Sequence, residues 1–213
     1  LTANTTGASN TAVGRYALFT NTTASNNTSV GTSSLAVNTT GASNTAIGFQ
    51  ALVANTTGYN NTVLGSVAGS GITTGGDNVA VGFNTMLATV TGDENTTIGN
   101  DSLKALTSGS YNTAVGANAL TANNTGADNI GVGYSALQGN TTGANNVAIG
   151  KWALQGNTTA SNNTATGYRA LNDNTTGAFN TALGRQASYS NTTGVSNVSI
   201  GSNALYTNTT GAN

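Results

Sequence analysis

The sequence contains no cysteine, no histidine and no proline, and charged residues make up only 5% of its 213 positions. Without cysteine and histidine, the chain lacks thiol nucleophiles, the imidazole base of hydrolytic triads and the usual zinc ligands. A net charge of −1 provides little electrostatic attraction for nucleic acid or anionic membranes. No apolar run approaches the roughly 20 residues of a membrane span. We therefore expect a non-enzymatic chain with no nucleic-acid partner and no membrane span.

What the sequence does contain is a strict repeat. A five-residue phrase that begins with Asn and ends with Gly starts at position 10 and returns every 17 residues, twelve times, without insertion or deletion. One unit reads N-T-A-V-G-x-x-A-L-x-x-N-T-T-G-x-x, and we number its positions from the Asn of the phrase. Because stacked coils cannot accept a shift in register, this period predicts a solenoid. The sequence starts and stops within a repeat, so we expect one continuous repeat domain over residues 1–213, cut from a longer array.

The composition of the unit favours strands over helices. Gly and Asn disfavour helix interiors, whereas Val, Ile and Thr suit strands, so we predict an all-β parallel solenoid of twelve 17-residue coils. Alternation along a strand places Thr11 and Val13 on one face and Ala12 on the other. Thr, Val and Ile replace one another at position 2, which suggests an inward, packed column together with the Val, Ile or Leu of position 4. The Leu column at position 9 completes this core, with gaps at Gly69 and Ser188.

Two positions of the phrase are expected to be structural. The Asn that opens it is present in every copy, and we expect these side chains to form a ladder of amide hydrogen bonds between coils. The Gly that closes it is equally constant and is expected to adopt a turn conformation closed to other residues. The representative positions are Asn10, Gly14, Asn78, Gly82, Asn146 and Gly150.

Three copies of the phrase carry a family resemblance. Residues 78–82 (NVAVG), 146–150 (NVAIG) and 197–201 (NVSIG) resemble the head repeats of YadA-like trimeric autotransporter adhesins. The whole chain is also similar to the N-T-A-V-G repeat arrays of bacterial and phage tail-fibre proteins. The YadA-like coil is shorter than 17 residues, so the Asn-Thr-Thr-Gly phrase must enlarge a turn or add a third side.

The resemblance implies a left-handed parallel β-roll that packs as a homotrimer. It implies an extracellular structural or adhesive fibre segment, at a cell surface as an adhesin or on a virion as a tail-fibre shaft, with itself and a host-surface glycan or protein as partners. The small column at position 3 would then face the threefold axis. A monomeric glycan- or ice-binding solenoid, with stacked Thr residues as its surface, is the alternative. The candidate interface residues are Ala12, Ala46, Ala80, Ala114, Ala148 and Ala182.

Aromatic and basic side chains gather at positions 6 and 7, directly after the phrase. Such side chains on a rigid scaffold form a candidate contact strip for a sugar or a protein. The other interpretation is that they cover the turn or a neighbouring chain. The strip consists of Arg15, Tyr16, Phe49, Phe83, Tyr134, Lys151, Trp152, Tyr168, Arg169 and Arg185.

Acidic residues and glycosylation sequons provide the remaining candidates. Asp77 and Glu94 occupy the same position of successive coils and Asp93 is adjacent, so their oxygens could hold a Ca²⁺ ion; a solvated acidic patch is the alternative. Seventeen N-x-[ST] sequons arise from the repeat, and a secreted chain could carry glycans on its Asn-Thr-Thr turns. No other cofactor is expected.

Overall fold

The computed structural model describes residues 1–212, in two compact units that comprise residues 1–108 and the chain from Gly109 onward. Each unit is treated by itself. In both, the regular secondary structure of the described residues consists of β-strands alone. Within residues 1–212 no helix has the length and apolar character that crossing a membrane requires.

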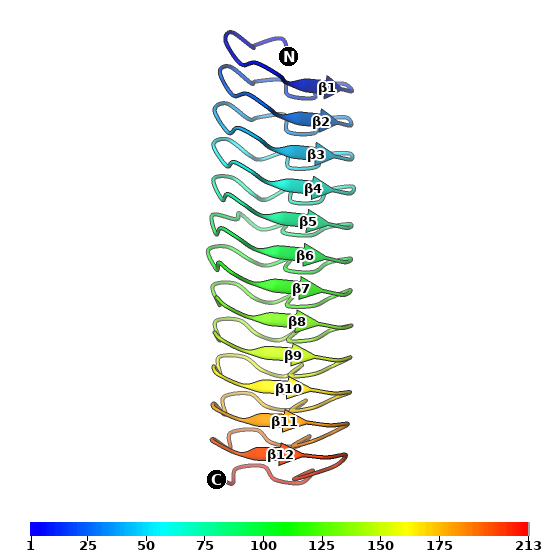
Figure 1. Cartoon of the computed structure of the whole chain (residues 1–213), viewed down its shortest axis with the longest axis vertical. Helices are drawn as coiled ribbons and strands as arrows, with labels where there is room; N and C mark the ends of the chain where they lie inside the picture. The colour runs from blue at the N-terminus through cyan, green and yellow to red at the C-terminus, as the bar shows by residue number, and fades with distance from the viewer. Residues whose placement is uncertain (213) are drawn as a thin grey trace. The chain divides into compact units, whose positions relative to one another are not determined.

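Each unit contains six short strands that pair in chain order, all in parallel and in register. In Figure 1 the labelled arrows of one unit lie side by side and point the same way, each joined to the next by a return segment behind the sheet. The first unit contains β1 (Thr11–Val13), β2 (Thr28–Val30), β3 (Thr45–Ile47), β4 (Thr62–Leu64), β5 (Val79–Val81) and β6 (Thr96–Ile98). The second contains β7 (Thr113–Val115), β8 (Ile130–Val132), β9 (Val147–Ile149), β10 (Thr164–Thr166), β11 (Thr181–Leu183) and β12 (Val198–Ile200).

Every strand covers positions 2 to 4 of its repeat, and every pairing joins equivalent positions, as Ala148 to Ala165 illustrates. The prediction of an all-β parallel solenoid built from 17-residue coils is therefore confirmed. A strand of three residues contributes few ladder bonds, so each coil depends on its neighbours for stability.

The predicted direction of the strand side chains was wrong. The small residue of position 3 is the buried one, with no exposed surface at Ala46, Ala80 or Ala148. Positions 2 and 4 point to solvent instead, and 43% of Ile149 is exposed. The candidate interface column thus lies inside its own coil and offers no surface to another chain, apart from the partly exposed Ala12. Ala114 and Ala182 are enclosed in the same way.

The thin cross-section of the coil explains this reversal. The interior already contains the Leu of position 9, the Ala of position 8 and two Asn side chains, as Leu154, Ala153, Asn146 and Asn157 show in one coil. Because interiors are close-packed, the space left opposite the Leu favours a small side chain, most often the methyl group of Ala, although Thr97 is buried there beside Leu103. The apolar Val63 is buried at position 3 in the coil where Gly69 replaces the Leu, which leaves room for it.

The Gly that closes the phrase has the predicted turn role. Its φ lies between 118° and 140° in all twelve copies, with 130° at Gly150. A Cβ atom on Gly150 would lie 2.7 Å from the carbonyl oxygen of Gly167 in the next coil. Both the left-handed backbone and the close approach of stacked coils therefore require glycine here. Gly14 and Gly82 meet the same two conditions.

Two Asn columns, rather than the one predicted, connect the coils. At position 1, the backbone N–H of each Asn donates to the Oδ1 of the Asn one coil earlier, as between Asn27 and Asn10 at 3.0 Å. At position 12, the side-chain amide of Asn38 donates to Oδ1 of Asn21 at 3.0 Å. The columns converge, because the carbonyl of Gly41 accepts from Nδ2 of both Asn27 and Asn38 at 3.0 and 2.9 Å. The expected Asn ladder is confirmed, with Asn78 and Asn146 as members.

The second Asn column is interrupted in the first unit. After Asn55, the interior is filled by apolar side chains without exposed surface, namely Ile72 and Leu106 at position 12 and Val90 at position 13, where Thr89 of position 12 is exposed. Ile72 and Val90 form an isolated parallel bridge. Oδ1 of Asn55 is buried and has no hydrogen-bond partner in the described part of the chain. Gly69 lacks the Leu side chain that position 9 usually contributes, and the side chains of Val63 and Ile72 fill that space.

Candidate functional surfaces

The outer face of each sheet is a continuous uncharged surface. Positions 2 and 4 of successive strands form two parallel columns of Thr, Val, Ile and Leu, and none of these positions carries a charge. The apolar side chains are substantially exposed, including Leu64 at 48%, Ile149 at 43% and Leu183 at 49%. Contiguous apolar surfaces of this kind mark interaction sites in soluble proteins. Sequence analysis missed this face because it directed these columns inward.

The second unit brings six of the ten predicted strip residues together. Trp152 is the centre: its ring lies 6.1 Å from Tyr134 and 5.7 Å from Tyr168, centroid to centroid. Nζ of Lys151 lies 4.0 Å from the Trp152 ring centroid, and the Arg169 guanidinium carbon lies 4.6 Å from it. These distances are within the range of cation–π attraction. We call this set the cation–aromatic row, which comprises Tyr134, Lys151, Trp152, Tyr168, Arg169 and Arg185.

The row follows from the repeat itself. Positions 6 and 7 come directly after the Gly turn, so consecutive coils place these side chains next to one another at the same edge of the sheet. Arg185 extends the row by one coil, with its guanidinium carbon 5.9 Å from the Tyr168 ring centroid. Position 7 has a left-handed backbone throughout, with φ 61° at Trp152 and 55° at Arg169.

The strip residues of the first unit do not form such a row. The guanidinium of Arg15 lies 4.5 Å from the Tyr16 ring centroid, and this pair is exposed. Phe49 and Phe83 occupy coils that are two repeats apart, and each is 50% exposed. The same repeat positions thus provide isolated contacts in one unit and a cluster in the other.

The predicted acidic cluster is engaged in hydrogen bonds. Oδ1 of Asp93 accepts from the backbone N–H of Gly76 at 2.7 Å, and Oδ1 of Asp77 accepts from Nδ2 of Asn60 at 3.0 Å. Glu94 has a left-handed backbone, with φ 56°, on an exposed turn. Over residues 1–212 no group of three or more His, Cys, Asp or Glu residues is arranged to hold a metal ion. The structure therefore adds no support for a Ca²⁺ site at these residues.

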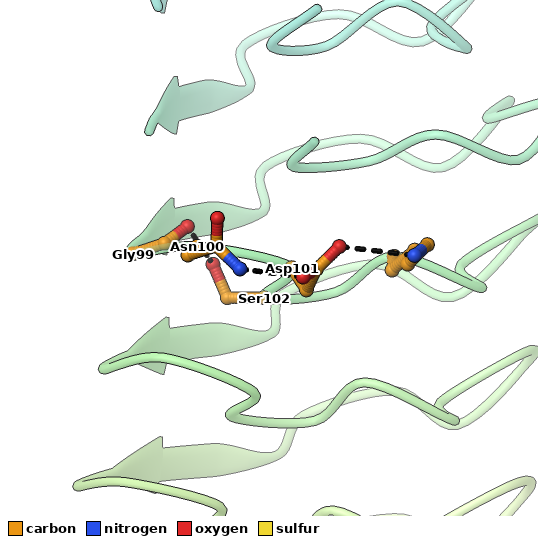
Figure 2. Close-up of polar contacts among 5 residues, drawn as sticks. Gly99, Asn100, Asp101 and Ser102 are labelled. Atoms are coloured by element: carbon orange, nitrogen blue, oxygen red, sulfur yellow. Dashed lines mark hydrogen bonds and ion pairs between the residues drawn. The ribbon is translucent and has the colours of Figure 1, made fainter. Parts of the chain in front are cut away.

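A polar cluster that the sequence did not suggest lies on the turn after β6 (Figure 2). Nζ of Lys104 lies 3.0 Å from Oδ1 of Asp101, while Asn100 donates to Oδ2 of the same carboxylate. Ser102 Oγ donates to the carbonyl of Gly99 at 3.0 Å. The hydrogen bond from Lys104 lowers the pKa of Asp101 below its ordinary value. The cluster is a local stabilising feature, since its carboxylate is already paired with a cation.

Most of the Asn-Thr-Thr sequons have a buried Asn, whereas Asn4 and Asn208 are partly exposed. The buried Asn side chains lie inside the coil with no exposed surface, as at Asn21, Asn38 and Asn140, and each Nδ2 already donates hydrogen bonds. Glycosylation of the Asn-Thr-Thr turns stays a prediction. The fully exposed sequon Asn residues are Asn26, Asn60, Asn100 and Asn162.

No pocket is present on the surface formed by residues 1–212. Each candidate is therefore an open surface, suited to contact with a large partner. Comparison with protein-family models, with curated proteins and with solved structures gave no match.

Proposed function

We propose that the chain is a structural and adhesive fibre segment without catalytic activity, which acts outside the cell in a surface adhesin or a tail-fibre shaft. Three copies associate through the outer faces of their sheets. The observation that supports this proposal is the pair of uncharged, largely apolar columns at positions 2 and 4. A left-handed coil and a homotrimer, which the resemblance to YadA-like head repeats implies, are part of the proposal.

Repetition without insertion supports the spacer role. Each coil adds the same short rise of about 4.8 Å, the spacing of neighbouring strands, so the length of such a segment increases with the number of repeats. The Asn columns and the Gly turns bind each coil to the next with the same contacts. The residues left free to vary lie on the turns, where contacts with a host surface can change without disturbing the stack.

The exposed sheet face identifies two variants that separate assembly from folding. Ile149→Asp places a charge on the outer face, where the monomer tolerates it, and should abolish association while the chain remains folded. Ala148→Phe forces a large ring into a filled interior and should unfold its region, at roughly 3 kcal/mol or more. Asn145→Asp adds the same charge on an exposed turn away from this face and should change neither property.

Light scattering and circular dichroism provide the measurements. We expect a mass three times 20.9 kDa for the unmodified chain and for Asn145→Asp, and 20.9 kDa for Ile149→Asp with an unchanged spectrum. A stable monomer for the unmodified chain at high concentration would contradict the proposed association. An Ile149→Asp variant that unfolds would instead contradict the assignment of this column to the outside.

A monomeric ice- or glycan-binding solenoid is the second candidate. The second Thr of the Asn-Thr-Thr phrase is exposed in consecutive coils, for example at Thr23, Thr40 and Thr57, and forms one regular column. The first Thr is less available, because its hydroxyl donates to the next coil, as Thr39 does to the carbonyl of Thr56 at 3.0 Å. Thermal hysteresis from a monomeric chain, lost in Thr57→Lys, would favour this candidate.

A further inference from the structure

The cation–aromatic row gathers most of the positive charge of the chain. Three of its five Lys and Arg residues, namely Lys151, Arg169 and Arg185, occupy three successive coils. Within residues 1–212 none of the three forms a salt bridge, and the nearest acidic influence is that of Asp173 on Arg169. Lys151 and Arg185 are exposed, so the row presents accessible cations that no salt bridge in this range neutralises.

The aromatic rings position these cations. Nζ of Lys151 and the guanidinium carbon of Arg169 lie 4.0 and 4.6 Å from the Trp152 ring centroid. The same carbon of Arg169 lies 5.4 Å from the Tyr168 ring centroid. Cation–π contacts restrain long flexible side chains without occupying their hydrogen-bond donors. Less side-chain entropy is then lost when an anion binds, which is the advantage of a preorganised site.

The direction of the row indicates an extended ligand. Neighbouring coils are separated by about 4.8 Å, so the three cations form a line parallel to the stacking direction in this unit. A ligand with anionic groups at regular intervals can pair with several of them at once. The exposed parts of Tyr134 and Tyr168, at 47% and 37%, provide apolar surface beside the charges.

We propose that the cation–aromatic row binds an anionic polysaccharide through its carboxylate or sulfate groups. Guanidinium and ammonium groups form strong charge-assisted hydrogen bonds with such groups, and aromatic surfaces pack against the apolar faces of sugar rings. This proposal goes beyond the fibre function, because it requires neither association of copies nor the sheet face.

Two other polyanions fit the row less well. Single-stranded nucleic acid binds through bases that stack on open aromatic faces, whereas the Trp152 ring already carries Lys151 and Arg169. A membrane surface is recognised by clusters of about four to eight basic residues, and the row has three. A polysaccharide needs only a few well-placed cations and adjacent apolar surface.

The single tryptophan of the chain is a direct reporter for this site, because Trp152 lies at its centre. Titration of the full chain with a heparin-derived decasaccharide, and separately with an oligogalacturonate, should produce a saturable change in tryptophan fluorescence with at least one of them. The change should weaken as salt is added, since charge pairs carry the binding. Neutral dextran should produce no change.

Variants connect the signal to the row. Arg169→Gln and Arg185→Gln should each weaken binding by about tenfold or more, the effect of losing a charge-assisted hydrogen bond. Arg15→Gln is the matched control, because Arg15 also follows a phrase Gly and lies on an aromatic ring, yet in an isolated pair. Its affinity should equal that of the unmodified chain. Circular dichroism confirms that each variant is folded.

Several outcomes would overturn the proposal. An unchanged fluorescence with both anionic saccharides would mean that the row binds neither. Equal loss in Arg15→Gln and Arg169→Gln would mean that binding depends on overall charge. Tighter binding of a short oligothymidylate, or of anionic lipid vesicles, would replace the polysaccharide with that ligand. Should Arg169→Gln fail to fold, Arg185→Gln and the salt dependence still decide the question, because Arg185 is exposed.

Discussion

The two units share one repeat and differ in how they fill position 12. In the second unit, Asn123, Asn140, Asn157, Asn174 and Asn191 form an unbroken column, with amide-to-Oδ1 distances of 2.8–3.0 Å. In the first unit the column stops at Asn55, and apolar packing continues the interior, with Ile72 and Leu106 at position 12 and Val90 at position 13. The same backbone thus accepts either a polar or an apolar interior, provided that neighbouring coils contain side chains of the same kind. The junction between them has a cost, the unpaired buried Oδ1 of Asn55.

The largest effect is expected where the polar column is complete. Asn157→Leu removes the donor to Oδ1 of Asn140 and the acceptor of the Asn174 amide, which lie 2.8 and 3.0 Å away. Because buried polar groups lose their partners on both sides, the variant should be destabilised by about 2–4 kcal/mol. Urea unfolding followed by circular dichroism measures the loss. Thr159→Leu, on an exposed position of the same turn, is the control and should be nearly neutral.

A smaller effect is expected from restoring the repeat consensus in the first unit. Gly69→Leu supplies the residue found at position 9 in most coils, but a Cβ at Gly69 would lie 3.0 Å from Val63 Cγ2 and 3.1 Å from Ile72 Cδ1. Overpacking should cost about 1–3 kcal/mol. Val63→Ala in the same chain should recover part of this loss. A consensus variant more stable than the original chain would show that the two interiors are interchangeable coil by coil.

Asn55→Leu gives the sharpest comparison with Asn157→Leu. Both variants remove an amide that donates to the preceding Asn, at 2.8 Å in each case. Asn55 has no acceptor role to lose, and its next interior neighbour is the apolar Ile72. The expected loss is therefore only about 1 kcal/mol. Equal losses for the two variants would mean that the continuity of the column makes no contribution.

The smallest effect is a difference in acid response. The Lys104 hydrogen bond lowers the pKa of Asp101 below the ordinary 3.8, so its stabilising contribution is present above that value and disappears as the pH falls through the lowered pKa. Burial raises the pKa of Asp173, against the opposing charge of Arg169, so its penalty is relieved as the pH falls through the raised pKa. Acidification should weaken the first unit and strengthen the second, each by a few tenths of a kcal/mol.

Melting temperatures measured across the acid range test this difference in direction. Asp101→Asn should remove the acid-induced loss, and Asp173→Asn should remove the acid-induced gain. Hydrogen exchange read peptide by peptide assigns each change to its unit. The same pH slope in both variants and in the unmodified chain would contradict the assignment of the two carboxylates.

The period of the sequence was sufficient to predict the coils, the strands and the Gly turns. A Gly in every copy indicated a backbone that other residues cannot adopt, and φ 133° at Gly82 agrees with this. Alternation also predicted that Ala148 and Ile149 point to opposite faces. It could not decide which face is inside, because that depends on how much space the Leu and Asn columns leave. A better signal was available, since a column that is small in most coils indicates a crowded site, whereas one that accepts both Thr and Ile indicates an open one.

The binding surfaces were predicted less completely. The strip residues lie at positions 6 and 7, and their role as a contact surface stays a prediction. The sequence alone did not show that Trp152 would contact both Lys151 and Arg169, because ring orientations depend on neighbouring side chains. The polar cluster around Asp101 gave no signal in the repeat, since its members occupy positions that vary from coil to coil. Surface chemistry thus depends on the individual coil, whereas the scaffold depends on the period.

The Asn columns also have a direction. In each bond the later coil donates and the earlier coil accepts, from Asn21 to Asn4 and from Asn38 to Asn21. A finished coil consequently presents open acceptors to the residues that follow it, as Asn55 does at the end of its column. During synthesis the amino-terminal coils emerge first, and each serves as a template whose acceptors select the register of the next. The coils can therefore fold one after another from the amino terminus, in the order in which the ribosome produces them.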